Sequence, residues 1–203
     1  MIKTDEYIKI KPVIIYPTCI KSGKRQDCFK CVIFKKNLCK SPRSLCAKEY
    51  IGHKKGCPNY GKYDLCPPNA PMFDEVFDMN KDIYLIYYKF DIKTHMEKMK
   101  KNHPDWTDRQ LRNVLYWQGT AKKHHKEEIK RFLSIHPDYE VAVPEAMGID
   151  VNKTLDNVGI ELEWPPINYS YRIALAGITK EGKSLKNYES CKSNHITNLN
   201  LKR

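Results

Sequence analysis

Residues 82–88 read DIYLIYY, and this stretch decides the fold class of the chain. A nearly continuous run of β-branched and aromatic residues is typical of a strand buried in a sheet. Two helices are expected after it, over residues 93–101 and 107–134, the second with Thr107 or Asp105 as its N-cap. The second helix places these apolar residues on one stripe: Leu111, Val114, Leu115, Ile129, Phe132 and Leu133.

Further elements are expected on both sides of this run. Residues 7–16 alternate and then become apolar, which predicts a strand interrupted at Pro12. The pattern predicts three more strands and two short helices: strands over residues 139–143, 160–163 and 169–176, and helices over 72–79 and 150–158, the last one closed by Gly159. These elements predict an α+β fold, in which a small mixed sheet has flanking helices and an N-terminal cysteine-rich, metal-stapled region.

Three regions follow from composition, and we expect them to pack as a single unit. Residues 1–70 form a cysteine-rich region that we expect to bind metal, residues 71–179 an α+β core, and residues 180–203 a Lys- and Asn-rich tail. The first region holds few large apolar residues between Pro17 and Pro68. Such a segment cannot build a hydrophobic core of its own, so it needs a metal or covalent links to hold a fold.

Seven of the eight cysteines lie in the first seventy residues, and only Cys191 stands apart. The N-terminus carries no apolar stretch typical of a signal peptide, and no run approaches eighteen apolar residues, so we expect a cytoplasmic protein without a membrane span. In a reducing compartment, grouped thiols indicate metal ligands rather than disulfides. The candidate ligands are Cys19, Cys28, Cys31, Cys39, Cys46, Cys57 and Cys66.

The first cysteine group is Cys28, Cys31 and Cys39, with Cys19 or Cys46 as a possible fourth ligand. Two residues between Cys28 and Cys31 allow both sulfurs to face one ion or cluster. Zinc accepts such a donor set, and so does a 4Fe-4S cluster. The chain lacks the second C-x2-C of a paired zinc ribbon and the histidines of a zinc finger. We therefore favour an iron–sulfur cluster, with zinc as the alternative.

The second group is Cys57 and Cys66 within residues 56–68, GCPNYGKYDLCPP. The prolines and glycines of this stretch predict turns around both sulfurs. Cys46, Cys57 and Cys66 could form a second site, completed by Cys191 or His53. Alternatively, one site draws on both groups and the remaining cysteines are structural.

Residues 56–68 resemble the C-x2-Y-G-x4-C-P-P signature of an uncharacterised family of predicted metal-binding proteins that is frequent in anaerobes and archaea. Residues 145–154, EAMGIDVNKT, are similar to the E-A-C-G-I-D-V-x-x-T segment of the same family. Lys54 and Met147 occupy positions where family members usually carry cysteine. The C-x2-C-x7-C-x2-P spacing that the family shows elsewhere is found here at residues 28–42. The resemblance implies metal binding and a fold, without specifying a reaction.

The formal net charge is +12, and residues 1–70 hold fifteen basic against five acidic residues. Lysines near a thiolate-bound metal offset its negative charge. A basic region of this kind also predicts two other functions. The chain could be a zinc-stapled protein that binds RNA or DNA, or a module without chemistry of its own that docks an acidic protein partner.

Few other residues suggest catalysis. His124 and His125 lie among charged residues and are expected on a solvated helix face. Asp150 is expected to cap the helix that follows it, and Glu145 stands on the other side of a glycine-containing turn. The chain has no P-loop and no dinucleotide-binding fingerprint. The sequence therefore predicts no reaction class, and whether the chain is an enzyme stays open.

Overall fold

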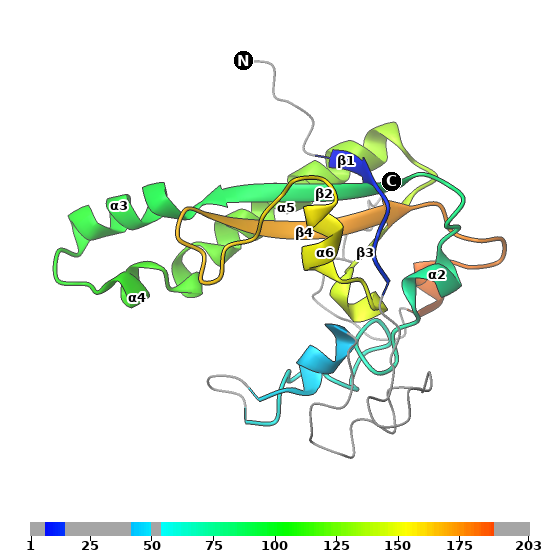
Figure 1. The fold of residues 1–203 in the computed structure, drawn as a ribbon, viewed down its shortest axis with the longest axis horizontal. Coiled ribbons are helices and arrows are strands. Elements are labelled where there is room, and N and C mark those ends of the chain that lie inside the picture. The colour runs from blue at the N-terminus through cyan, green and yellow to red at the C-terminus, as the bar shows by residue number, and fades with distance from the viewer. Residues whose placement is uncertain (1–6, 15–41, 50–53, 189–203) are drawn as a thin grey trace.

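Two long strands, β2 (Ile83–Asp91) and β4 (Tyr169–Gly177), form the centre of the protein. The structure is a computed structural model, and it describes residues 7–14, 42–49 and 54–188. In Figure 1 the two strands run side by side, with helix α5 behind them and helix α6 in front. The other bounds are β1 (Tyr7–Ile10), η1 (Pro42–Ala47), α2 (Phe73–Val76), α3 (Ile92–Asn102), α4 (Asp108–Leu111), η2 (Val114–Tyr116), α5 (Gln118–Ile135), β3 (Glu140–Ala142), η3 (Glu145–Met147), α6 (Val151–Asp156) and η4 (Leu185–Tyr188).

The sheet has the strand order β1-β2-β4-β3. Each of its three pairings is antiparallel, with Leu85 opposite Leu175 at the centre. The predicted α+β class is confirmed, although these pairings differ from the mixed sheet that we expected. The run at residues 82–88 does form a buried strand, because both faces of the sheet are covered at this point. The predicted N-terminal strand is present as β1 and pairs with β2, so it belongs to the sheet of the core.

One face of the sheet carries the larger core. Ile83, Leu85 and Leu175 lie on this face. They pack with Phe73, the first residue of α2, and with Phe77, which directly follows this helix. Met147, Ile149 and Leu155, in and around η3 and α6, complete it together with Leu185 of η4. On the other face, Ile129 and Phe132 of α5 pack against Ile86, Ala174 and Ala176. The sheet is thus enclosed between α5 and a layer of short elements.

The helix expected over residues 107–134 is broken, so that prediction is wrong for its first third. The Asn113 side chain accepts a hydrogen bond from the amide of Leu115 (3.1 Å) and starts the separate turn η2. The ring of Trp117 stacks on Phe90 at 5.1 Å and fixes where α5 begins. Val114 and Leu115 are consequently exposed rather than on a buried stripe, whereas Leu111, Ile129 and Phe132 are buried as predicted.

Two other predictions differ from the structure. Residues 160–163 form no strand, because the Glu163 carboxylate accepts hydrogen bonds from the amides of Ile167 (2.8 Å) and Asn168 (2.7 Å) and closes a loop there. The first part of the expected tail, residues 180–188, is folded onto the core. Leu185 is buried, and the Glu140 carboxylate accepts hydrogen bonds from the Ser184 hydroxyl and the Leu185 amide.

Candidate metal centre at the cysteine-bearing turns

Three of the predicted ligands lie in the described part of the chain, on η1 and on the turns of residues 54–68. In Figure 1 these segments lie together, away from the long strands of the sheet. Cys46 is near the end of η1, and the amide of Cys57 donates a hydrogen bond to its carbonyl oxygen (2.8 Å). Gly56 precedes this contact with φ +79°, and a Cβ there would lie 2.6 Å from the same oxygen. Only glycine allows the two backbones to approach this closely.

Tight backbone turns position the third cysteine, Cys66. Its amide donates to the carbonyl of Tyr63 (3.0 Å), and its own carbonyl accepts from the amide of Ala70 (3.0 Å). A hydrogen bond from the Gly61 amide to the Pro67 carbonyl (2.8 Å) closes the loop between the two cysteines of the motif. The turns that the prolines and glycines predicted are therefore present around Cys57 and Cys66.

Arg43 joins η1 to the segment that follows Cys66. Its side chain is 6% exposed, and its guanidinium donates hydrogen bonds to the carbonyl oxygens of Pro68 (2.7 Å) and Ala70 (2.6 Å). These bonds hold Cys46, three residues after Arg43, against the C-P-P turn. This role of Arg43 could not be predicted from the sequence, because nothing local distinguishes Arg43 from the many other basic residues around it.

The thiols of Cys46, Cys57 and Cys66 are half-buried, unoxidised and close enough to influence one another electrostatically. The pKa of Cys46 is raised to about 11, mainly by burial and also by negative charge on Cys57, Cys66 and Glu145. Burial also raises the pKa of Cys66, with a further contribution from Cys57. A cation placed among these sulfurs would reverse both effects, because it favours the thiolate form.

Glu145 connects this corner with the sheet. It lies on η3, which packs against η1, and its side chain reaches solvent. Protein packed around the carboxyl raises its pKa, while Arg172 of β4 acts in the opposite direction. Desolvation in turn lowers the pKa of Arg172, and the charge of Glu145 opposes that change. The Glu145 carboxyl thus lies within electrostatic range of both the Cys46 thiol and the Arg172 guanidinium.

The donor chemistry of the three thiols suits zinc or iron, but these sulfurs do not suffice for a site as they stand. Within residues 7–14, 42–49 and 54–188, no three Cys, His, Asp or Glu side chains converge closely enough to hold a metal ion. The other predicted ligands, Cys19, Cys28, Cys31 and Cys39, lie outside the described residues. The same holds for the two possible completing residues, Cys191 and His53.

The remaining candidate residues have structural roles. Met147, at a position where the similar family carries cysteine, is buried in the larger core, and Lys54 is exposed. Asp150 caps α6 as predicted, since its carboxylate accepts a hydrogen bond from the Lys153 amide (3.1 Å). The expected solvated face is wrong for His125, which is 2% exposed and lies 3.2 Å from the Ile86 carbonyl oxygen through its Nε2.

Comparison with known proteins does not assign the chain to a family. No protein-family model, curated protein or solved structure matches the chain. The family resemblance of the two motifs therefore stays a prediction. Across the part of the chain that the structure describes, no helix combines the length and apolar character needed to cross a bilayer.

Proposed function

We propose that this chain is a cytoplasmic metal-binding protein and that its cysteines hold a 4Fe-4S cluster. The observation that carries the proposal is the grouping of the Cys46, Cys57 and Cys66 thiols, brought together from two separate segments without forming a disulfide. Three free thiols in one corner offer the soft sulfur donors that zinc and iron–sulfur clusters use.

The chain path supports a contribution from the first cysteine group as well. Before residues 15–41, Ile14 forms a β-bridge with Ile149, and the Val13 carbonyl accepts a hydrogen bond from the Asp150 amide (2.8 Å). After them, η1 begins at Pro42 and packs on η3, a few residues from Ile149. Both chain ends that flank Cys19, Cys28, Cys31 and Cys39 are therefore anchored to one short segment, next to the thiols of the second group.

The sequence lacks the second C-x2-C of a paired zinc ribbon and the histidines of a zinc finger, and both absences favour a cluster over zinc. A cluster could be structural, transfer electrons or act as a Lewis acid through an iron without a cysteine ligand. Because the raised pKa keeps the Cys46 thiol protonated at neutral pH, binding any of these metals releases a proton there, and loading is expected to weaken steadily as the pH falls.

Metal and sulfide analysis of anaerobically purified full-length protein tests the proposal. We expect about four iron and four sulfide per chain, as a 4Fe-4S cluster requires, with a broad absorption band in the visible range that bleaches on reduction. Zinc at one equivalent without sulfide would replace the cluster by the zinc alternative. Protein that retains neither metal after anaerobic reconstitution would overturn the proposal altogether.

Single substitutions then assign the ligands. Cys57→Ser and Cys66→Ser are expected to lower the iron content severalfold, whereas Leu45→Ala, next to Cys46 and 58% exposed, is the matched control and should retain iron. Cys28→Ser and Cys31→Ser test the first group in the same way. Loss of iron in both sets indicates one site that draws on both groups. Full iron content in Cys57→Ser and Cys66→Ser would show that the second group is structural.

A further inference from the structure

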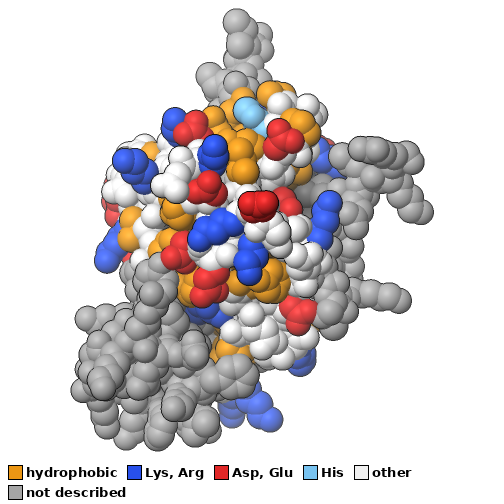
Figure 2. All heavy atoms as spheres, turned by 90° about the vertical axis from the view of Figure 1, so that its right-hand side faces the viewer, with side chains coloured by type: hydrophobic (Ala, Val, Ile, Leu, Met, Phe, Trp, Pro, Cys, Tyr) orange, Lys and Arg blue, Asp and Glu red, His pale blue; other side chains and the backbone are white. Residues whose placement is uncertain are grey.

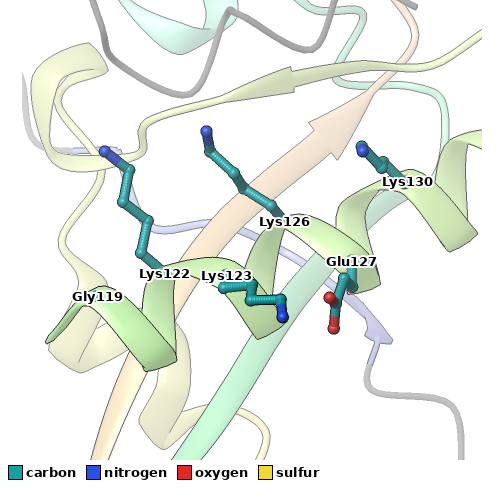
Figure 3. Close-up of a pocket in the computed structure, with 6 residues that line it drawn as sticks. All are labelled: Gly119, Lys122, Lys123, Lys126, Glu127 and Lys130. Carbon is teal, nitrogen blue, oxygen red and sulfur yellow. The ribbon is translucent and has the colours of Figure 1, made fainter. Parts of the chain in front are cut away.

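Helix α5 carries a shallow groove on its outward face, remote in the sequence from the cysteines. Six residues line it: Gly119, Lys122, Lys123, Lys126, Glu127 and Lys130. Figure 3 shows that the side chains of Lys122, Lys126 and Lys130 extend to the same side of the helix. Lys123 and Glu127 extend to the other side, so the groove runs between two ridges of side chains.

The spacing of the first ridge is regular. Lys122, Lys126 and Lys130 follow one another at four-residue intervals, which corresponds to about 6 Å of rise per step and about 12 Å in total. Lys122 and Lys126 are half-buried and Lys130 is exposed, so the aliphatic stems of the first two pack on the protein while their ammonium groups reach outward. The ridge is therefore a short straight row of positive charges.

The acidic residues nearby are already engaged. Glu127 is the acidic member of the lining, and its carboxylate lies 3.1 Å from the Nδ1 of His124, within hydrogen-bond distance. Glu128 is buried and forms an ion pair with Arg131. Among the described residues, no carboxylate forms an ion pair with any of the four lysines of the groove. Like charges four residues apart destabilise a helix slightly, and an anion bound along the row would relieve this repulsion.

The start of the groove adds to its positive character. Gly119 lies in the first turn of α5, where backbone amides point outward and the helix dipole is positive. An added Cβ at Gly119 would meet no atom within 4 Å, so packing does not require glycine there. Glycine is unfavourable inside a helix, and here it leaves the backbone of the first turn accessible.

The composition of the lining selects among possible occupants. The core of a stable protein–protein interface is depleted of charged residues and enriched in aromatic ones, and a helix that lies on a membrane inserts apolar residues. No lining residue offers either. Protein–nucleic acid interfaces are polar and strongly basic, and lysines contact successive phosphates without reading the bases. Another surface of the protein lacks this bias, since Figure 2 shows acidic and basic side chains interspersed at the end of the domain opposite α3.

We propose that the α5 groove binds single-stranded nucleic acid through its phosphates, independently of sequence. The row Lys122-Lys126-Lys130 follows the backbone of the strand, while Lys123 and the first turn of α5 contact it from the other ridge. This function is separate from metal binding. It also places nucleic-acid binding on a helix of the core, whereas the charge of the sequence alone pointed to residues 1–70.

Fluorescence anisotropy with labelled 20-nucleotide oligo(U) and oligo(dT) tests the proposal on the full chain. We expect binding that weakens steeply with salt. The triple variant Lys122→Gln/Lys126→Gln/Lys130→Gln should lower the affinity at low salt at least tenfold. It should also reduce the slope of log affinity against log salt by about 2, because each phosphate contact on a single strand contributes about 0.7.

A matched control removes the same charge from another helix. Lys93→Gln/Lys98→Gln/Lys101→Gln on α3 should change the affinity less than threefold and leave the slope nearly unchanged. Glu127→Gln, which removes the acidic member of the groove, should raise the affinity. Circular dichroism and thermal unfolding establish that each variant is folded, and Glu127→Gln tests the groove even if the triple variant fails to fold.

Three outcomes contradict the proposal. Absence of binding to both oligonucleotides at low salt removes it, and so does an equal loss of affinity in the α5 and α3 triple variants. The third is competition by poly-glutamate that matches competition by unlabelled oligonucleotide, because the groove would then bind any polyanion. Similar affinity for oligo(U) and oligo(dT) supports recognition through phosphates, whereas binding to one of them alone contradicts it.

Discussion

The backbone amide of Cys57 donates a hydrogen bond of 2.8 Å to the carbonyl oxygen of Cys46. This bond joins two segments, η1 and the turns of residues 54–68, and it brings the first cysteine of the C-x2-Y-G-x4-C-P-P motif beside a cysteine outside it. The geometry depends on Gly56 and Arg43, which act on the backbone rather than on the sulfurs. Both can be tested separately from any metal.

Gly56→Ala should destabilise the protein more than an alanine at another left-handed glycine. Gly182→Ala is the control, because Gly182 has φ +69° and an added Cβ there meets nothing within 4 Å. We expect Gly182→Ala to lower the free energy of unfolding by about 1–2 kcal/mol through backbone strain. Gly56→Ala should cost a further 1–3 kcal/mol or so, because its Cβ overlaps the Cys46 carbonyl oxygen. Urea unfolding measures both, and equal values would show that the two backbones separate freely.

Arg43→Ala should lower the free energy of unfolding by about 3 kcal/mol, because it leaves the buried carbonyl oxygen of Ala70 and the partly buried one of Pro68 without a donor. Arg43→Lys should recover only part of the loss, since an ammonium cannot reproduce the planar fork of the guanidinium. Arg109→Ala, at an exposed position of α4, should change stability by less than about 0.5 kcal/mol. If Arg43→Ala behaves like Arg109→Ala, the guanidinium does not hold η1 in place.

Acid should destabilise the protein through His125. The pKa of His125 is lowered to about 4, mainly by burial and also by the charge of Arg172, while the Ile86 carbonyl and Glu128 oppose the change. The unfolded chain takes up this proton near pH 6.5 and the folded protein does not, so this group lowers the free energy of unfolding as the pH falls from 6.5 to 4. The decrease is about 1.4 kcal/mol per pH unit.

His125→Gln should remove that part of the pH dependence, because an amide can donate to the same carbonyl without titrating. His124→Gln, on the half-exposed neighbouring position, should leave it intact. Urea unfolding at pH 7, 6 and 5 gives the slope of the free energy of unfolding against pH for the wild type and for each of the two variants. Parallel curves for His125→Gln and the wild type would show that His125 has the same pKa in the folded and the unfolded protein.

Glu140→Ala should release the C-terminal segment of the described chain from the sheet. The Glu140 carboxylate accepts hydrogen bonds from the Ser184 hydroxyl (2.7 Å) and the Leu185 amide (2.6 Å), and Leu185 is buried. We expect the Leu185 amide to exchange its hydrogen about tenfold faster or more. Glu161→Ala removes the same charge from an exposed position and should leave this exchange unchanged. Unaltered exchange in Glu140→Ala would mean that burial of Leu185 alone holds the segment.

The parts of the fold that depend on local patterns could be predicted from sequence. The run at residues 82–88 gave β2, and Asp150 marked the start of α6, because an apolar run and a capping side chain act within a few residues. The break between α4 and α5 could not be predicted, because it depends on Trp117 stacking against Phe90, a contact fixed only by the tertiary structure. The turns around Cys57 and Cys66 depend on local prolines and glycines and were predicted. The hydrogen bonds of Arg43 and the burial of His125 depend on distant parts of the chain and were not.

The segment around Ile149 also sets an order of events during synthesis. Val13 and Ile14 pair with residues 149–154, and η1 packs on η3, so the N-terminal segments find their partners more than a hundred positions later in the chain. A ribosome makes the cysteine-bearing segments first, and they must wait until that partner segment has emerged. The cysteine-bearing segments η1 and residues 54–68 therefore lack this packing for most of translation, and the burial of their thiols becomes a late event in the folding of the chain.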